Sequence, residues 1–248
     1  MRRLGCRGVM RRLAAGLLAA VALGASAQPP LREAAAGDVA ALVKWLDAGA
    51  SPSASDATGE TPLHAAARAG QVGAMALLVT RGAAIEARND AGETPLYVAA
   101  ERGQLEAVRL LLARRADAGA RTASGETAMH AAAMHGSPFV IDALADAGAD
   151  VAAANRAGER PLFWAAGTGT LEAVRRLLER GAPAGARDAA GYTALHAAAD
   201  SGHGDVVRVL LDARADPGVR DAAGDRPADL ARRRGYEEIA RLLEAGLR

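Results

Sequence analysis

The chain has 248 residues and a formal net charge of +1, and 50% of its residues are apolar but only 3% aromatic. Most of the apolar excess is alanine, so we expect close packing of small side chains. The only lysine is Lys44. Phosphate binding needs clustered Lys and Arg, so the composition argues against a nucleic-acid partner.

The N-terminus has the pattern of a cleavable signal peptide over residues 1–27. Residues 1–12 carry five arginines and no acidic residue, and residues 13–23 form an apolar run. Ala25-Ser26-Ala27 then places small residues at the cleavage positions before Gln28. The alternative is an uncleaved anchor or a core helix, but the apolar run is short for a membrane span.

Cleavage after Ala27 changes the charge and removes the only thiol. Five of the 30 basic residues lie in the signal, so the mature chain has 25 basic and 29 acidic residues and a formal charge of −4. The only cysteine, Cys6, also leaves. The mature protein therefore has no disulfide, thiol nucleophile or thiolate metal ligand.

The rest of the chain is organised by a repeat of 33 residues. The stretch from Gly59 to Ala67 (GETPLHAAA) returns from Gly92 as GETPLYVAA, and variants of it begin at four later glycines, Gly125, Gly158, Gly191 and Gly224. A strict period of this size is typical of a solenoid. We divide the chain into a truncated N-terminal capping unit, 28–55, five full units, 56–88, 89–121, 122–154, 155–187 and 188–220, and a C-terminal capping unit, 221–248.

The sequence of each unit predicts two short helices. In the unit 56–88, Thr61 is a helix N-cap and Pro62 takes the first helical position, where its missing N–H is harmless. The first helix ends at Gly70, and the second ends at Gly82, which can adopt positive φ. In the truncated first unit, Asp38 is expected to cap the second helix.

This pattern resembles the ankyrin repeat. The resemblance rests on Asp-x-x-Gly-x-Thr-Pro-Leu-His-x-Ala-Ala followed by a glycine and a leucine-rich helix. It implies an all-α solenoid of about seven helix–turn–helix units, two of them capping units, with short β-hairpin fingers. Fingers and first helices would line a concave surface. It also implies structural roles, including a histidine bond that ties helix to turn, for Thr61, Pro62, His64, Thr94, Pro95, His130 and His196.

Several units depart from the pattern at positions that shape the helix ends. Arg160 and Arg226 replace the capping threonine, which removes a cap worth about 0.5–2 kcal/mol. Arg115 and Arg214 stand where other units end the second helix with glycine, at a cost of about 1 kcal/mol if φ is positive. Ser137 is expected to cap the second helix of its own unit, with a proline following it.

The sequence contains no motif for catalysis, metal binding or a cofactor. Successive members of the set His64, His130 and His196 are two units apart, on the order of 20 Å for helices packed at about 8–10 Å. That separation exceeds a metal–ligand distance of about 2 Å. Gly-x-Ser-x-Gly, a phosphate loop and His-Glu-x-x-His do not occur. We therefore expect no enzyme activity, no metal and no cofactor.

An acidic row is expected along the finger tips. It consists of Glu60, Glu93, Glu126, Glu159 and Asp225, with Tyr192 interrupting it. Arg88, Arg121 and Arg220 lie five residues before members of this row, and pairing across each hairpin would give a self-compensated edge. Glu159 has Ala154 in the arginine position, so it is expected to be the least compensated.

A second cluster, in the middle of the stack, is the candidate partner-binding site. It consists of Met134, His135, Phe163, Trp164, Tyr192 and Glu159. Trp and Tyr are enriched in interface hot spots. The alternative is that Phe163 and Trp164 fill space left by small alanines. Tyr97, at the histidine position of an earlier unit, supports this alternative.

These features favour a non-enzymatic scaffold that binds a protein partner on its concave face in the bacterial periplasm. The alanine- and arginine-rich, lysine-poor composition indicates a GC-rich bacterial source. A secreted effector that binds host or competitor proteins is the alternative, and an accessory subunit of a periplasmic enzyme is less favoured. We expect a monomer with no membrane segment after signal cleavage.

Overall fold

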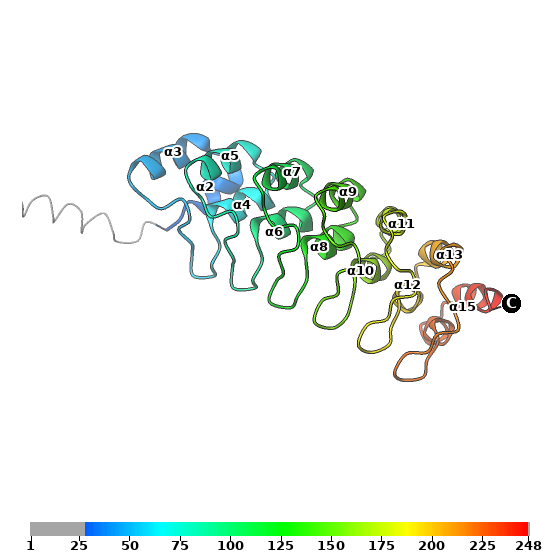
Figure 1. Ribbon diagram of the computed structural model, residues 1–248. Helices are drawn as coiled ribbons and strands as arrows, with labels where there is room; N and C mark the ends of the chain where they lie inside the picture. Colours follow the sequence, from blue (N-terminus) through cyan, green and yellow to red (C-terminus); the bar gives the residue numbers. More distant parts are fainter. Residues whose placement is uncertain (1–27, 248) are drawn as a thin grey trace, which may run out of the picture.

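The computed structural model describes residues 28–247, which form a single row of paired helices (Figure 1). The predicted signal peptide, with Cys6, lies outside the described residues. The fourteen helices between residues 28 and 247 are α2 (Leu31–Ala36), α3 (Val39–Asp47), α4 (Pro62–Arg68), α5 (Val72–Thr80), α6 (Pro95–Glu101), α7 (Leu105–Ala113), α8 (Ala128–His135), α9 (Pro138–Asp146), α10 (Pro161–Thr168), α11 (Leu171–Glu179), α12 (Ala194–Ser201), α13 (Gly204–Asp212), α14 (Pro227–Arg233) and α15 (Glu237–Ala245).

The helices form two layers. Each even-numbered helix packs against the even-numbered helices before and after it, and each odd-numbered helix does the same in its own layer. Figure 1 shows the long loops, which we call fingers, on the side of the even-numbered helices. We call the surface made by the fingers and the even-numbered helices the inner face. The expected all-α solenoid is confirmed.

The core repeats with the sequence. Leu63, Leu96, Met129, Leu162 and Leu195 occupy the same position in successive even-numbered helices, and each is at most 2% exposed. The alanines that follow them in these helices are also buried. Small side chains let neighbouring helices approach closely, which explains how a chain poor in aromatics fills its interior.

Side-chain caps start several helices as expected. Thr61 accepts a hydrogen bond from the backbone N–H of His64 at the start of α4, and Thr94 caps α6 in the same way. Asp38 caps α3 and Ser137 caps α9. Each of these oxygens satisfies an N–H that has no partner within its own helix.

The fingers are tight turns, and no residue between 28 and 247 lies in a regular β-strand. The backbone N–H of Asp56 donates to Glu60 across its own finger, at 2.9 Å. One backbone hydrogen bond then links neighbouring fingers, as when Asp90 N donates to Thr58 O at 2.9 Å. The arms are too short for a ladder, so the expected β-hairpins take the form of hydrogen-bonded turns.

Two arginines adopt the left-handed conformation expected of glycine. Arg115 has φ of 66° and Arg214 has φ of 61°, and they are the non-glycine residues with positive φ in the part of the chain that the structure describes. Both follow the ends of odd-numbered helices, where Gly82 has φ of 88°. These units keep the same helix ending without glycine and bear the steric cost of the Cβ.

Replacing either arginine by glycine should therefore stabilise the fold. We expect Arg115→Gly and Arg214→Gly each to raise the free energy of unfolding by about 1 kcal/mol. Urea denaturation measures the change. Arg114→Gly is the matched control, because Arg114 has φ of −92° and gains nothing from glycine. Equal effects at positions 114 and 115 would contradict the explanation.

Candidate functional site

A threonine–histidine contact starts three of the even-numbered helices. Nδ1 of His64 lies 2.8 Å from Thr61 Oγ1 and 3.3 Å from Thr61 N, and Nε2 lies 3.0 Å from the backbone oxygen of Glu93 in the next finger. The Thr61 N–H can only donate, so Nδ1 accepts and Nε2 carries the proton. The imidazole thus joins helix, turn and the following unit.

The same contact recurs at two further junctions. His130 lies between Thr127 and the backbone oxygen of Glu159, with Nε2 at 3.2 Å. His196 lies between Thr193 and the backbone oxygen of Asp225, also with Nε2 at 3.2 Å. The side chains of His64, His130 and His196 are fully buried. Burial lowers the pKa of each imidazole below its ordinary value, which keeps the ring neutral.

The other units fill the histidine position differently. Tyr97 is 7% exposed, and Phe163 is partly buried against the core. In the last unit Asp229 accepts from Arg226 N at 2.9 Å and from Arg226 Nε at 3.1 Å, and these bonds lower its pKa to about 2. The cap expected to be lost at Arg226 is therefore replaced from inside the helix. At Arg160 no side-chain cap is present, as expected.

Trp164, on α10, contacts its own finger and the preceding even-numbered helix, α8. Its Nε1 donates to Glu159 Oε2 at 3.0 Å, and its ring meets the His130 ring edge-on, with centroids 5.5 Å apart. The indole is partly exposed. Trp164 thus covers the junction between α8 and α10 on the inner face and holds the Glu159 carboxylate in place.

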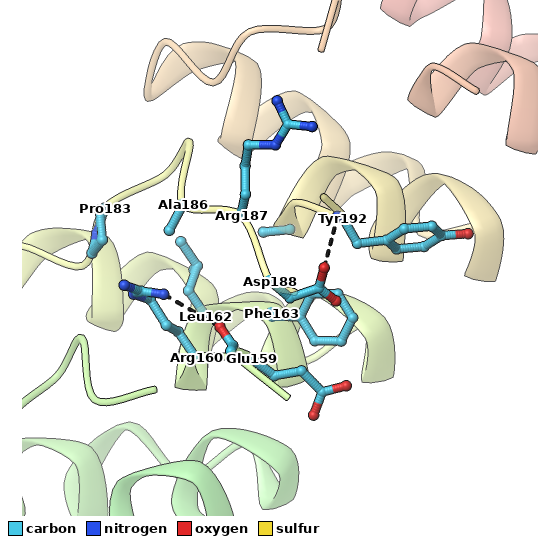
Figure 2. A pocket seen from close by; sticks show the side chains of 11 residues that line it. Glu159, Arg160, Leu162, Phe163, Pro183, Ala186, Arg187, Asp188 and Tyr192 are labelled. Atoms are coloured by element: carbon cyan, nitrogen blue, oxygen red, sulfur yellow. Dashed lines mark hydrogen bonds between the residues drawn. The ribbon is translucent and has the colours of Figure 1, made fainter. Parts of the chain in front are cut away.

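Phe163 and Tyr192 form a second aromatic group one unit further along. Their ring centroids are 6.5 Å apart, and Tyr192 lies 5.0 Å from the His196 ring. Figure 2 shows the Phe163 ring between the Glu159 finger and the Tyr192 finger. Phe163 packs against the core, whereas Tyr192 is partly exposed. Phe163 and Trp164 are both partly exposed, but Phe163 packs against the core whereas Trp164 donates a hydrogen bond to the Glu159 carboxylate.

Met134 and His135 lie at the end of α8, and both are exposed. The His135 ring lies against Gly103 of the preceding unit, in the place that Gln104 takes over Gly70. His135 therefore packs on its neighbour as well as facing solvent.

The expected pairing of finger arginines with finger acids is wrong. Arg88 Nη1 donates to the backbone oxygens of Gly92 and Arg121, at 3.0 and 2.5 Å. Arg121 and Arg220 also donate to backbone oxygens at the finger tips. For Arg88 and Arg121, one acceptor lies in the arginine's own finger and the other lies one unit further along the chain, so the guanidinium joins neighbouring fingers.

The acids instead find partners that sequence reasoning missed. Neutral side chains four residues earlier donate to Oε2 of three glutamates: Asn89 to Glu93 at 2.7 Å, Thr122 to Glu126 at 2.6 Å and Asn155 to Glu159 at 2.8 Å. Arg68 and Arg233, each eight residues after an acid, pair with Glu60 and Asp225. The polar residue that begins each finger, four positions before the acid, is the sequence feature that could have predicted these hydrogen bonds.

A small cavity lies between the Glu159 and Tyr192 fingers (Figure 2). Arg160, Phe163, Arg187 and Tyr192 are among its lining residues, and its volume is about 10 Å³. That is room for about one water molecule and not for an organic ligand.

Within residues 28–247, no group of three or more His, Cys, Asp or Glu side chains has an arrangement that could hold a metal ion. No helix in the same range has the length and apolarity to cross a membrane.

Comparison with known families gives one clear match. A family model described as "Ankyrin repeats (3 copies)" matches residues 31–122, 111–188, 129–221 and 183–247, which together cover nearly the whole described chain. No curated protein matches the sequence.

The buried histidines make a pH dependence of stability testable. The pKa values of the three histidines are lowered in the folded chain, so below about pH 6.5 the unfolded chain binds more protons than the folded chain. The free energy of unfolding therefore decreases as the pH is lowered through this range. We expect the unfolding free energy to drop between pH 7.5 and 5.5, by up to about 1.4 kcal/mol per histidine for each pH unit below 6.5. Urea denaturation at the two pH values measures it. His130→Asn should show a smaller drop, and an equal drop would contradict the role of His130.

Proposed function

The chain belongs to the ankyrin repeat family, and we propose that it is an exported scaffold that binds a protein partner on its inner face. Ankyrin repeats imply protein–protein interaction, and members of the family are generally non-enzymatic binding scaffolds. The choice of surface rests on this chain's own residues.

The observation that carries the proposal is Trp164. The same position in the other even-numbered helices from α4 onward is occupied by Ala65, Val98, Ala131, Ala197 and Leu230, each at most 8% exposed. Trp164 instead presents a partly exposed indole at the centre of the inner face. At this position the other units from α4 onward carry buried aliphatic side chains, and only this unit presents a large aromatic ring to solvent. Protein interfaces commonly use such a ring as a hot spot.

The fold supports such an anchor with little entropy cost. Trp164 is fixed by Glu159, and the backbone of Glu159 is fixed by His130. A partner that meets a side chain already held in one orientation loses less free energy to ordering. Tyr192 and Met134, in the adjacent units, extend the surface on either side.

Export is supported by residues 1–27, with their arginines, apolar run and small residues before Gln28. The composition favours a bacterial source, and the periplasm is the proposed compartment. A secreted effector acting on host or competitor proteins is the alternative, since it would use the same inner face on a different partner.

Cell fractionation tests the compartment. We expect the chain, expressed with its own N-terminus in a Gram-negative host, to appear in the periplasm with Gln28 as its first residue. Mass spectrometry of the purified protein identifies that residue. Deleting residues 2–27 should retain the chain in the cytoplasm. Recovery of the mature chain mainly in the medium would favour the effector alternative.

Trp164→Ala tests the binding surface. We expect it to weaken capture of the protein partner from the native extract by at least about 10-fold, because hot-spot truncation costs more than about 1.4 kcal/mol. The matched control is Phe139→Ala, which removes a 64% exposed ring from α9 in the other helix layer. It should leave capture unchanged.

Stability decides between interface and core. Thermal unfolding of Trp164→Ala should stay within a few degrees of the parent chain, since the indole is only partly buried. A large fall in melting temperature with unchanged capture would assign Trp164 to packing and remove the basis of the proposed surface.

A further inference from the structure

Three carboxylates on the inner face each have one oxygen that accepts hydrogen bonds from the part of the chain that the structure describes and one oxygen that does not. Glu93, Glu126 and Glu159 stand one unit apart, and in each the Oε2 atom accepts from a neutral side chain of its own finger. In residues 28–247, no hydrogen bond reaches Oε1 of these glutamates and no salt bridge reaches either oxygen. Each presents one ordered acceptor without a cationic partner.

The chain itself shows what completes such a carboxylate. Both oxygens of Glu60 accept from the guanidinium of Arg68, at 2.7 and 3.0 Å, and Asp225 pairs with Arg233. The arginine in each case lies eight residues after the acid, on the following helix. The same positions after the three central glutamates hold Glu101, Met134 and Gly167. Glu60 and Asp225 are therefore paired with an arginine of the described chain, and the three central glutamates are not.

Nearby arginines do not fill this gap. The finger arginines Arg88 and Arg121 donate to backbone oxygens. Arg160 directs its guanidinium away from the Glu159 carboxylate and toward the Pro183 side of the finger, as Figure 2 shows. Ala154 stands where an arginine precedes other finger acids, but the expectation that this makes Glu159 the least compensated acid is wrong, because the arginines at that position bond to backbone oxygens. None of these arginines therefore forms an ion pair with the three central glutamates.

An independent observation points to a ligand at the same place. Trp164 is a partly exposed indole bonded to Glu159, and exposed Met134 and partly exposed Tyr192 lie in the adjoining units. Aromatic faces attract Lys and Arg side chains, and a carboxylate beside the ring adds a direct ionic partner. Arg also forms paired bonds to one carboxylate, as Arg68 does here.

We infer that the partner is a basic protein segment whose Arg or Lys side chains take, at Glu93, Glu126 and Glu159, the place that Arg68 takes at Glu60. This inference rests on the proposed scaffold function and names the chemistry of its partner. Packed helices stand about 8–10 Å apart, so the cations should recur at about that spacing. Arginines seven residues apart on an α-helix, at about 10.5 Å, or three apart in a polyproline II segment, which has three residues per turn and rises about 9.3 Å over them, meet this requirement.

Synthetic peptides test the inference on the full mature chain. One α-helical and one polyproline II probe carry three arginines at these spacings, and matched probes carry glutamate at the same positions. Fluorescence anisotropy of labelled peptides measures binding. We expect at least one arginine probe to bind at least about 10-fold more tightly than its glutamate counterpart. The inference would be overturned if neither arginine probe bound more tightly than its glutamate counterpart.

Charge-neutral variants localise the effect. Glu93→Gln, Glu126→Gln and Glu159→Gln combined should weaken the arginine probe at least about 10-fold. The matched control combines Glu106→Gln, Glu172→Gln and Glu238→Gln, which makes the same change of net charge on the odd-numbered helices. It should change binding less than about 3-fold. Equal losses in both triple variants would show unspecific attraction and overturn the inference.

The two proposals fail in different ways. If the native chain captures no protein from its extract, the scaffold function itself fails. If a captured partner is lost with Trp164→Ala but is retained by the inner triple variant, the scaffold function stands and the basic-partner inference fails. Matching melting temperatures of the parent and both triple variants confirm that the comparison concerns binding.

Discussion

The buried threonine–histidine contact is the interaction on which the inner face depends. One neutral imidazole satisfies donors at the start of its own helix and donates to the next finger, so a single side chain fixes both parts of a junction. The junctions built this way begin at His64, His130 and His196. The fingers that they hold include those of Glu93 and Glu159. The positions of the Glu93 and Glu159 carboxylates therefore depend on a bond made in the interior.

Departures from the repeat carry most of the functional information. A residue that returns every 33 positions serves the scaffold, since every unit needs the same caps and the same core. Trp164 breaks a row of small or buried side chains, and Ala154 breaks a row of arginines. The change at Trp164 places a partly exposed ring against the Glu159 carboxylate, which has no cationic partner in residues 28–247. The repeats thus provide a rigid background against which one region differs.

Local sequence predicted much of the fold because helix ends are decided by neighbouring residues. The caps at Thr61 and Ser137 and the positive φ of Arg115 depend on atoms within a few positions of each residue. The pairing of Arg88 with a finger acid was predicted from the same kind of proximity and was wrong. Backbone oxygens of the turn, including one from the next finger, competed for the guanidinium, and a spacing of five residues does not reveal them.

The sequence by itself determined the period, the paired helices, the alanine-rich core and the set of residues in which function had to be sought. It left Phe163 and Trp164 equivalent, as two aromatic residues in succession. Only the tertiary structure separated them, by packing Phe163 on the core and bonding Trp164 to Glu159. The tertiary structure also decided which finger acids form a salt bridge with an arginine of the described chain and which do not. Glu60 and Glu93 share the same local motif, and their difference arises on the following helix, which folding brings back beside the finger.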